Sequence, residues 1–409
     1  MKIYISGISG TGMGPLALMA KKAGVEVYGS DLHEGAIYQE LIDAGIETKI
    51  GEQDGEFLRE KIKDGVEWFV YTSALPEDAP EMLVAREAGI RISKRDNLTE
   101  FLVQKMGLMM VAVAGTHGKT TTTSMIVWAC SKLGLPAAYI VGSTLGFASS
   151  GSYSEADKYF VYEADEYDRN FLKFHPWLAV ITSVSYDHPD IYKTPEEYKE
   201  AFSQFESQSK KVIKDFEFDL NKFKLAGEAR RYDAALAFLA IKEIIKNEKS
   251  EISDDEIVKV LNEFPGVGRR FEKLSEGIYT DYAHHPEEIK ATMDVALDQM
   301  DIDGKKGVVV IYQPHQNTRQ HEVQDLYYDV FIGAEKVFWL PTYLTREDSS
   351  LPILKPIDFI NGLNNVEVAE TAELNDDLWK RICEYRDDGY LVILMTAGPA
   401  DEWLRRKLA

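Results

Sequence analysis

A glycine-rich segment with a lysine and a run of threonines is the strongest chemical signal in the sequence. The segment AGTHGKTTTT covers residues 114–123 and lies between an apolar, strand-like run and a helix-like stretch. Glycines in such a turn let backbone N–H groups close around phosphate oxygens, and the N-terminus of the following helix favours negative charge. In this arrangement Lys119 reaches the β- and γ-phosphates, and the hydroxyl of Thr120 is a ligand for Mg²⁺. The segment predicts a nucleoside triphosphate site; a strand-to-helix turn with a surface lysine is the alternative.

Acidic residues follow two further strand-like runs, in YEADEYD (162–168) and in VSYDHPD (184–190). Ligands of open α/β proteins collect at the carboxyl ends of parallel strands, which would put both segments beside the phosphate loop. A carboxylate there can hold the Mg²⁺ that a nucleoside triphosphate needs. His188, flanked by carboxylates, can serve as a second metal ligand or a phosphate contact. A solvated acidic loop and a structural histidine are the alternatives.

A second glycine-rich loop, GISGTGMG (7–14), follows the opening strand-like run, and Asp31 follows the next one. This is where a dinucleotide-binding fold places its phosphate loop and its ribose-binding acid. The glycine spacing is G-x-x-G-x-G rather than G-x-G-x-x-G. The loop therefore predicts a site for some diphosphate, with a nicotinamide dinucleotide as the weaker reading and a plain tight turn as the third.

The last third of the chain carries a different set of chemical groups. Two adjacent arginines end GVGRRF (266–271), and histidines follow strand-like runs in TDYAHHPEE (280–288) and QPHQNTR (313–319). Guanidinium groups suit the recognition of phosphates and carboxylates. Two histidine-bearing strand ends in one small domain favour a site over surface histidines, while the arginines have a linker pair as their alternative.

Strand-like and helix-like runs alternate along the whole chain, which predicts an α/β fold with parallel sheets. A length of 409 residues suggests two or three domains. The elements fall into three pieces, with boundaries near residue 105, where a fresh strand-like run begins, and near residue 267, beside GVGRRF.

The composition excludes several classes of protein. With 46 basic and 68 acidic residues the net charge is −22, which argues against a nucleic-acid-binding surface. The two cysteines, Cys130 and Cys383, are too few for a disulfide framework, and both are expected to be buried thiols. The sequence shows neither a signal peptide nor an apolar run long enough to cross a bilayer. We therefore expect an acidic, cytoplasmic, multi-domain protein.

Taken together, these motifs resemble those of the Mur ligases, the ATP-dependent enzymes that build the peptide stem of peptidoglycan. The matching motifs occur in the family order: GxxGxGM (7–13), GSD (29–31), YTSALPED (71–78), GTHGKT (115–120), EADEYDRNFL (163–172), DHPD (187–190), GVGRRF (266–271), DYAHHP (281–286) and QPHxxTR (313–319). Each motif alone is modest, but the ordered set is specific and covers nearly the whole chain.

The resemblance implies a fold of three domains. A Rossmann-like N-terminal domain (1–104) would bind a UDP-sugar, a P-loop ATPase-like central domain (105–267) ATP, and a Rossmann-like C-terminal domain (268–409) the incoming amino acid. It is nearest to the branch that joins L-alanine to the carboxylate of UDP-N-acetylmuramate through an acyl phosphate. ATP and Mg²⁺ are the implied cofactors. Small molecules, without nucleic acid or membrane, are the expected partners of a monomer or homodimer.

The resemblance also assigns roles to individual positions. The catalytic groups would be Lys119, His188, Arg269 and Arg270. ATP would contact Gly115, Thr116, His117, Gly118, Lys119, Thr120 and Thr121, with Asp281 on its ribose. The UDP-sugar would contact Gly10, Thr11, Gly12, Met13, Asp31 and Ser73. Tyr282, His284 and Arg319 would line the amino-acid pocket. Thr120 and Glu163 would hold one Mg²⁺ and His188 a second.

Three departures from the family pattern bear on these roles. GEARRYD (227–233) stands where the family has GxHNxxN near the adenine, so Ala229 and Arg230 replace a His-Asn pair. Only 39 residues separate His188 from Gly227, which predicts a shortened central domain that has lost strands. Gln316 replaces an arginine expected near the amino acid.

Two alternatives to the alanine-adding branch follow from these departures. A related recycling ligase attaches a tripeptide to the same sugar nucleotide and is compatible with EADEYD. A nucleotide-binding homologue that has lost catalysis would explain the altered and shortened central domain. A nicotinamide-dependent dehydrogenase, the remaining reading, leaves the phosphate loop unexplained.

Overall fold

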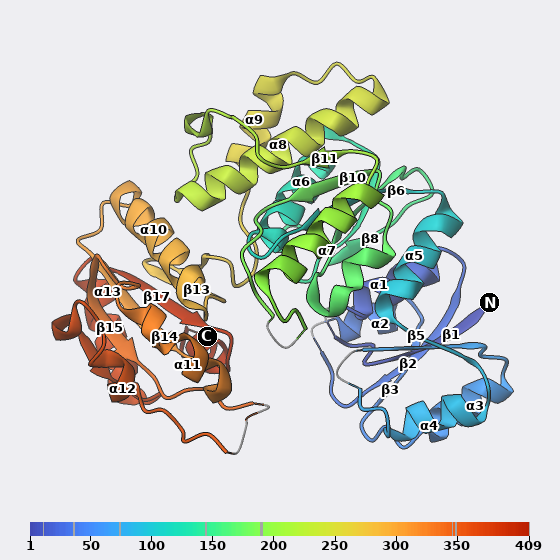
Figure 1. Ribbon diagram of the computed structural model, residues 1–409, viewed down its shortest axis with the longest axis horizontal. Helices are drawn as coiled ribbons and strands as arrows, with labels where there is room; N and C mark the ends of the chain where they lie inside the picture. The colour runs from blue at the N-terminus through green and yellow to red at the C-terminus, as the bar shows by residue number, and fades with distance from the viewer. Residues whose placement is uncertain are drawn as a thin grey trace. The chain divides into compact units, whose positions relative to one another are not determined.

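The computed structural model describes residues 1–408 except 11, 36, 73–74, 144, 189–190, 346 and 348–349. The chain forms two compact units, Met1–Phe218 with Asp233–Pro265 and Asp219–Tyr232 with Gly266–Ala409. Its three sheets are largely parallel, two in the first unit and one in the second (Figure 1). The predicted α/β class is confirmed. The domain boundaries at 104/105 and 267/268 stay predictions.

The N-terminal sheet is parallel throughout and has the strand order β3-β2-β1-β4-β5. Its elements are β1 (Lys2–Ser6), α1 (Gly14–Lys22), β2 (Glu26–Asp31), α2 (Tyr38–Asp43), β3 (Glu47–Ile50), α3 (Glu56–Lys63), β4 (Trp68–Tyr71), α4 (Pro80–Glu87), β5 (Arg91–Lys94) and α5 (Arg95–Met106). The strand order reverses between β1 and β4. Ligands of doubly wound sheets bind at such a switch point, and the first glycine-rich loop begins there.

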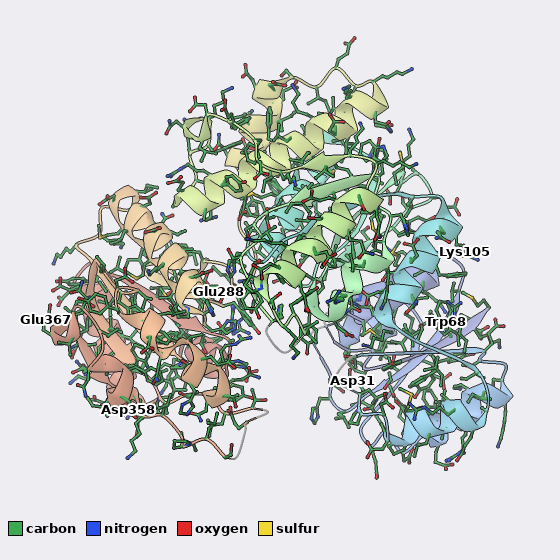
Figure 2. All side chains as sticks on the ribbon, viewed as in Figure 1. Asp31, Trp68, Lys105, Glu288, Asp358 and Glu367 are labelled. Atoms are coloured by element: carbon green, nitrogen blue, oxygen red, sulfur yellow. The ribbon has the colours of Figure 1, made fainter. Side chains whose placement is uncertain are left out.

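Alternation of side chains along the strands explains how helices cover both faces of this sheet. Ile3 and Ile5 belong to the same buried cluster as residues of α1, α2 and α5. Tyr4, which points the other way, packs with Phe69 and with residues of α3 and α4. Trp68, labelled in Figure 2, lies on the first of these faces.

The second sheet of this unit has the order β11-β10-β6-β9-β7-β8 and is parallel except at the β7–β8 pair. Its elements are β6 (Met109–Ala114), α6 (Lys119–Leu133), β7 (Ala137–Ile140), β8 (Gly151–Ser152), β9 (Tyr159–Glu163), η1 (Tyr167–Lys173), β10 (Leu178–Ile181), α7 (Pro195–Gln208), β11 (Val212–Ile213), α8 (Glu228–Glu248) and α9 (Asp254–Asn262). The short η2 (Leu220–Lys222) and the first residues of α8 belong to the second unit. β6 lies between β9 and β10, so the loop that follows it is flanked by the ends of both neighbours.

One buried cluster extends across both sheets of the first unit. It joins Ile5 and Leu102 to Ala112 and Phe160, which lie on the central strands β6 and β9. The continuous apolar core explains why the two sheets form one compact unit, and it brings the two glycine-rich loops onto a common body.

The sheet of the second unit has the order β12-β13-β17-β14-β15-β16, with only β12 antiparallel. Its elements are β12 (Glu272–Ser275), β13 (Ile278–Asp281), α10 (Pro286–Ile302), β14 (Val308–Gln313), α11 (Asn317–Val323), η3 (Gln324–Tyr327), β15 (Ala334–Trp339), α12 (Pro356–Ile360), η4 (Val366–Val368), β16 (Ala369–Thr371), α13 (Asp376–Asp387), β17 (Leu391–Thr396) and α14 (Ala400–Leu408). α10, η3 and α12 pack on one face, and α13 and α14 on the other (Figure 1). The predicted sites at the ends of β13 and β14 are thereby held by a packed sheet.

Two minor expectations can be compared with the structure. Cys130 is buried in α6, as predicted, whereas Cys383 in α13 is partly exposed, so the prediction of a buried thiol is wrong there. Across the described residues, every helix is too short or too polar to cross a bilayer.

Candidate functional site

The phosphate loop connects β6 to α6 through two glycines in conformations that other residues rarely adopt. Gly115 has φ 143° and Gly118 has φ 82°. A Cβ on Gly115 would lie 2.1 Å from Thr182 Oγ1, and one on Gly118 would lie 2.5 Å from Asp233 Oδ1. Both the backbone conformation and the lack of space therefore require glycine at these two positions.

Lys119, the first residue of α6, pairs with a carboxylate. Its Nζ lies 2.9 Å from both carboxylate oxygens of Glu166 and also donates to the carbonyl of Gly115. Glu166 is only 1% exposed. Burial raises the pKa of Glu166, and the charge of Lys119 opposes that rise. The lysine is thus held on a buried counterion beside the loop where a phosphate would bind.

Thr120 and Glu163 lie next to each other at the ends of neighbouring elements. Thr120 Oγ1 donates to Glu163 Oε2 at 3.1 Å, and the other carboxylate oxygen accepts from Gly142 N at 3.2 Å. The described residues hold no cluster of three or more histidine, cysteine or acidic side chains suited to a metal. Mg²⁺ commonly takes one or two carboxylates and completes its shell with water and substrate phosphates. A hydroxyl beside one carboxylate fits that kind of site.

His188 approaches the same carboxylate as Lys119 from the other side. Its Nε2 lies 3.8 Å from Glu166 Oε1 and 3.6 Å from Asp187 Oδ2, and its ring packs edge-on against Tyr167 at 5.1 Å. The backbone of His188 has φ 57°, which turns the chain sharply there. Glu166 therefore contacts both Lys119 and His188. Asp190, from the same DHPD motif as His188, lies outside the described residues.

The remaining loop residues fix the loop to the end of β10. Thr116 Oγ1 donates to Ser185 O at 2.7 Å and lies 2.9 Å from the hydroxyl of Tyr198. His117 N donates to Ser183 Oγ at 2.9 Å. Thr121 lies half-buried in the first turn of α6. These contacts stabilise the loop conformation and occupy the backbone N–H groups of Thr116 and His117.

The first glycine-rich loop is tied to the ends of β1 and β2. Gly7 N donates to Ser30 O at 2.8 Å, and Ser9 N donates to Asp31 Oδ2 at 2.9 Å. A Cβ on Gly12 would lie 2.4 Å from Arg95 Nη1, so this guanidinium lies directly over the loop. Asp31, a predicted contact of the UDP-sugar, therefore accepts a hydrogen bond from the backbone of the loop itself.

A cavity of about 460 Å³ opens beside this loop. It is lined by Gly7, Gly10, Gly12, Met13, Asp31, Thr72, Lys94, Arg95, Asp96, Asp165, Tyr167 and Asn170. Four of the predicted UDP-sugar residues thus share one cavity with residues of the central sheet region. Thr11 and Ser73 lie outside the described residues. Lys94 and Arg95 are the basic residues of this lining, and guanidinium groups suit phosphate recognition, but Asp31, Asp96 and Asp165 also line the cavity.

Near the same loop lies a carboxylate whose partners among the described residues are neutral. Glu81, on α4, is 1% exposed. It accepts hydrogen bonds from Tyr4 OH at 2.7 Å, Ser6 Oγ at 2.6 Å, Ser30 Oγ at 2.5 Å and Gln53 Nε2 at 3.2 Å. These neutral donors come from β1, β2 and the segment after β3, so Glu81 ties together the strand ends that carry the loop.

In the second unit, Asp281 at the end of β13 is committed to the protein interior. Its carboxylate accepts from Phe271 N at 2.6 Å, Ala283 N at 2.8 Å and Thr292 Oγ1 at 3.2 Å. Burial raises the pKa of Asp281. The contact with the ATP ribose that the resemblance implied would have to compete with these three hydrogen bonds.

The two arginines of GVGRRF pack on a residue of the predicted amino-acid pocket. The guanidinium carbons of Arg269 and Arg270 lie 4.6 and 5.4 Å from the ring centre of Tyr282. Arg269 Nη2 also donates to Thr396 O at 2.7 Å, and its backbone has φ 57°. The structure therefore brings Arg269, Arg270 and Tyr282 together.

His284 and Arg319 are in direct contact. Arg319 Nη1 lies 2.7 Å from His284 Nε2, and the other ring nitrogen, Nδ1, lies 3.1 Å from Glu288 Oε2. Glu288, labelled in Figure 2, is on the first turn of α10 and also accepts from the backbone N–H of His284. The three predicted amino-acid residues thus lie together, with a carboxylate behind them that sequence analysis gave no role.

The departures from the family pattern are also visible. Residues 228–232 form the first turn of α8, where Arg231 Nη1 lies 3.1 Å from Asp298 Oδ2 on α10. Ala229 is exposed. Gln316 precedes α11 with φ 62°, and its N–H donates to Tyr343 O at 2.9 Å.

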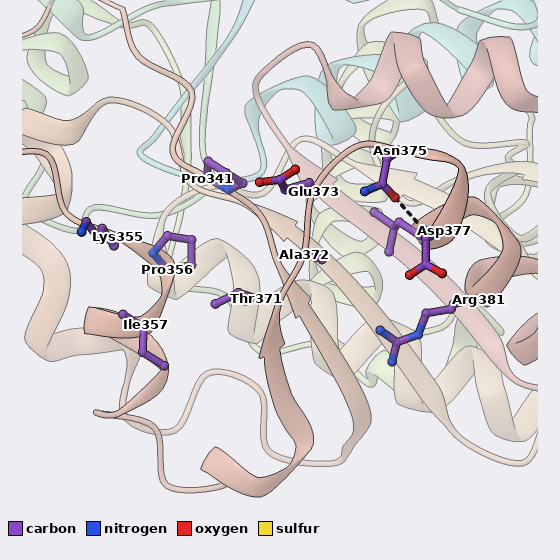
Figure 3. A pocket seen from close by; sticks show the side chains of 11 residues that line it. Pro341, Lys355, Pro356, Ile357, Thr371, Ala372, Glu373, Asn375, Asp377 and Arg381 are labelled. Carbon is purple, nitrogen blue, oxygen red and sulfur yellow. Dashed lines mark hydrogen bonds between the residues drawn. The ribbon is translucent and has the colours of Figure 1, made fainter.

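A further cavity, of about 500 Å³, lies between α12 and the N-terminus of α13 (Figure 3). Among its lining residues are Pro341, Lys355, Asn375 and Arg381, and its described lining includes none of the predicted site residues. The side chain of Asn375 caps α13 by accepting from Leu378 N at 2.9 Å.

Four functional candidates received no role from the sequence: Glu81, Arg95, Glu166 and Glu288. Glu166 lies inside YEADEYD and Glu288 inside HHPEE, so the motifs located them without saying which carboxylate faces inward. Glu81 follows YTSALPED and Arg95 follows β5, and only the packing of α4 and α5 brings them to the loop.

Comparison with known proteins decides the family. Residues 2–105 match the model described as Mur ligase family, catalytic domain, and residues 113–215 match the Mur ligase middle domain. A UDP-N-acetylmuramate–L-alanine ligase from Fusobacterium nucleatum is 31% identical, over 97% of this chain and 94% of that protein. The chain belongs to the Mur ligase family. A Mur ligase of the same name from Carboxydothermus hydrogenoformans is 30% identical, over 97% of this chain and 94% of its own.

Solved structures of Mur ligases share the fold. The UDP-N-acetylmuramate-alanine ligase of Thermotoga maritima aligns with a TM-score of 0.75 at 23% identity, over 100% of this chain and 98% of that one. A murein peptide ligase from Psychrobacter arcticus aligns with a TM-score of 0.61, also at 23% identity, over 100% of this chain and 98% of that one. The three-domain α/β fold implied by the resemblance is confirmed.

Proposed function

We propose that this Mur ligase joins L-alanine to the carboxylate of UDP-N-acetylmuramate, with cleavage of ATP to ADP and phosphate. The observation that carries the proposal is similarity over nearly the whole chain, at about 30% identity, to ligases named for this reaction. Three features support it: the glycine-rich loop that carries Lys119, a cavity beside the other glycine-rich loop, and the contact between His284 and Arg319.

In the first half-reaction a carboxylate oxygen of the sugar nucleotide attacks the γ-phosphorus of ATP, and ADP leaves. Carboxylate and triphosphate repel each other, so this step needs fixed positive charge. Lys119 supplies it by moving from Glu166 to the phosphate oxygens. Glu166, being buried, then becomes a weaker competitor because its pKa is already raised by burial.

In the second half-reaction the amine of alanine attacks the acyl carbon, a tetrahedral intermediate forms, and phosphate leaves with its electron pair. Arg319 would bind the alanine carboxylate, and Tyr282 and His284 would line the pocket. Arg269 and Arg270 would stabilise the negative charge of phosphate or of the intermediate, as guanidinium groups do. Gln316 supplies no charge where the family has an arginine.

Thr120 and Glu163 are the residues that would hold one Mg²⁺, and His188 the residue that would meet a second. Bound Mg²⁺ would neutralise phosphate charge during transfer. Because His188 contacts Glu166, it is also positioned to keep that carboxylate oriented when Lys119 leaves it.

We further propose that the enzyme works in the cytoplasm as a monomer or homodimer, with small molecules as its partners. The recycling reaction with a tripeptide and loss of catalysis are both less favoured. The curated relatives are named for the alanine reaction, and Lys119, Glu163 and His188 are all in place beside the phosphate loop.

The test is phosphate release from ATP in the presence of UDP-N-acetylmuramate and a panel of amino acids and the stem tripeptide. We expect release with L-alanine to exceed that with every other acceptor. Preference for the tripeptide would assign the recycling reaction. Absence of release with every acceptor, from protein that binds ATP, would indicate a homologue that has lost catalysis.

A further inference from the structure

The contacts around His284 fix which of its ring nitrogens carries a proton. Nδ1 lies 3.1 Å from Tyr282 O and 3.1 Å from Glu288 Oε2, and both of these atoms accept hydrogen bonds. Nε2 lies 2.7 Å from Arg319 Nη1, and a guanidinium can only donate. Nδ1 must therefore carry the hydrogen, and Nε2 must keep its lone pair. Nε2 is therefore the ring atom with a lone pair that can accept a proton.

Glu288 is arranged to stabilise a proton that arrives there. Oε2 of Glu288 accepts from the backbone N–H of His284 at 3.1 Å and of His285 at 3.2 Å, as well as meeting Nδ1. Its side chain is 21% exposed, and that of His284 is 14% exposed. Burial would raise the pKa of Glu288, but its hydrogen bond with His284 and the nearby charge of Arg270 hold that pKa well below its usual range. A carboxylate that stays ionised beside Nδ1 favours the imidazolium form of the ring.

The amine of alanine has to be deprotonated before it can react. At neutral pH the amine is an ammonium ion without a lone pair, so it must lose a proton before it can attack an acyl phosphate. A base within the alanine pocket removes that proton where it is needed. Arg319, the guanidinium expected on the alanine carboxylate, is the group that covers Nε2 of His284 before alanine binds.

We propose that His284 is the base that deprotonates the incoming amine, that Glu288 is its positioning residue, and that Arg319 covers the base until alanine binds. The proposal rests on the proposed alanine-ligase function. The alanine carboxylate draws Arg319 away from Nε2, and the ammonium group then transfers one proton to Nε2. The products are a neutral amine with a free lone pair and an imidazolium balanced by Glu288.

Other charged and titratable groups around the ring set its pH response. They are Arg319 on α11, His315 after β14 with its ring 5.5 Å away, Tyr312 on β14 with its hydroxyl on His284 O, and Arg270, whose charge acts on Glu288. Arg319 and Arg270 oppose formation of the imidazolium, and Glu288 favours it. Bound alanine brings a carboxylate that offsets the charge of Arg319.

Glu288 also belongs to the capping box at the start of α10, so a purely structural role has to be separated from the proposed one. Glu288→Gln keeps an oxygen that can accept the same three hydrogen bonds but removes the charge. Glu287→Gln, one position earlier on the exposed side of the helix, is the matched control. The measurement is kcat/KM for alanine against pH, with hydroxylamine as a second nucleophile that is already a neutral amine at pH 7.

For Glu288→Gln we expect kcat/KM for alanine to fall about a hundredfold, within the range of base catalysis. The midpoint of the acidic limb should move down by about one pH unit or more, because the imidazolium has lost its partner. Hydroxamate formation from hydroxylamine, and KM for ATP, should match wild type and Glu287→Gln. An unshifted acidic limb, or an equal fall with hydroxylamine, would overturn the role of Glu288.

A second experiment tests Arg319 and does not depend on Glu288→Gln folding. Alaninamide lacks the carboxylate, so in wild type it leaves Arg319 on Nε2 and reacts poorly. Arg319→Ala uncovers the base permanently, and we expect alaninamide to react faster with this variant than with wild type while alanine reacts more slowly. A fall or no change with alaninamide would overturn the covering step. If wild type itself makes no product with alanine, the proposed function fails instead.

Discussion

Two glycine-rich loops of the first unit each lie above a glutamate that is 1% exposed, yet the two carboxylates have different partners. Glu81, below the loop at 7–14, accepts hydrogen bonds from three hydroxyls and an amide. Glu166, beside the loop at 115–120, pairs with Lys119 and approaches His188. The described partners of Glu81 are neutral, whereas Glu166 pairs with the cationic side chain of Lys119.

The difference shows how one fold provides both a fixed site and a responsive one. The donors to Glu81 are neutral side chains of β1, β2 and the segment after β3, so no charge holds them ready for a phosphate. Lys119 has a long side chain, and in the proposed mechanism it exchanges Glu166 for the phosphate oxygens of ATP. We therefore expect the two loops to fail in different ways when their supporting groups are changed.

The largest effect is expected from Lys119→Ala. It removes the cation that the γ-phosphate requires, so ligation should be abolished. The UDP-sugar loop keeps its own supports, and calorimetry should show UDP-N-acetylmuramate binding close to wild type. Loss of sugar binding would contradict the assignment of the two ligands to different loops.

A control variant separates chemistry from stability in this test. Removing Lys119 leaves Glu166 buried without its partner, which costs about 3–5 kcal/mol when the charge stays. The double change Lys119→Ala with Glu166→Gln removes that charge. We expect it to regain stability against urea but not activity.

The next effect concerns the predicted metal residues. Glu163→Ala and His188→Ala should each lose activity by about a hundredfold, the scale of removing a charge-stabilising group. Raising the Mg²⁺ concentration should partly restore the activity of Glu163→Ala, because Thr120, the other expected ligand of the same ion, is unchanged. Near-normal turnover of His188→Ala at ordinary Mg²⁺ would contradict the proposed metal role of His188.

The comparison of the two loops also shows what the sequence could predict. The alternation of elements and the glycine spacing predicted the sheets and both loops, because these follow from local residue types and strand periodicity. The sequence did not single out Glu81 or Glu166 as the buried carboxylate. That distinction depends on which helix packs over which strand end, and neighbouring acids such as Asp165 and Asp168 look equivalent in the sequence.

The same limit applied in the second unit. His284 and Arg319 were predicted for one pocket, and the structure places them in contact. The family resemblance assigned Asp281 to the ATP ribose, although its carboxylate accepts three hydrogen bonds from interior donors. A residue at a strand end can face a ligand or its own core, and the register of the following helix decides between them.

A smaller effect is expected at Glu81, where the framework itself is changed. Glu81→Ala leaves several buried hydroxyls without an acceptor, and we expect a loss of about 3 kcal/mol in the free energy of unfolding. Glu81→Gln should lose about 1 kcal/mol, since its amide still offers one acceptor oxygen. Among folded protein, KM for UDP-N-acetylmuramate should rise while KM for ATP stays constant. Equal changes in both would mean that Glu81 supports the whole unit rather than its own loop.

The smallest effect is expected for the choice between ATP and GTP. The groups described in the two loops are not expected to contact the nucleotide base. Lys119, Thr120 and the loop backbone address phosphates, so discrimination between adenine and guanine must come from polar groups paired with the base edge. A site that hydrogen-bonds one base rejects another because its own buried groups are left unpaired. In most of the family a His-Asn pair lies near the adenine; here those positions are Ala229 and Arg230.

In the structure, the segment that contains Ala229 and Arg230 has a structural role. It begins α8, and Arg231 anchors that beginning to Asp298 on α10. Loss of one hydrogen bond to the base is worth about 0.5–1.5 kcal/mol, or about two- to twelvefold in discrimination. We therefore expect this enzyme to use ATP but to tolerate GTP better than a Mur ligase that carries GxHNxxN. The measurement is the ratio of kcat/KM for ATP and GTP in both enzymes. An equal or stricter preference for ATP would mean that other residues hold the adenine.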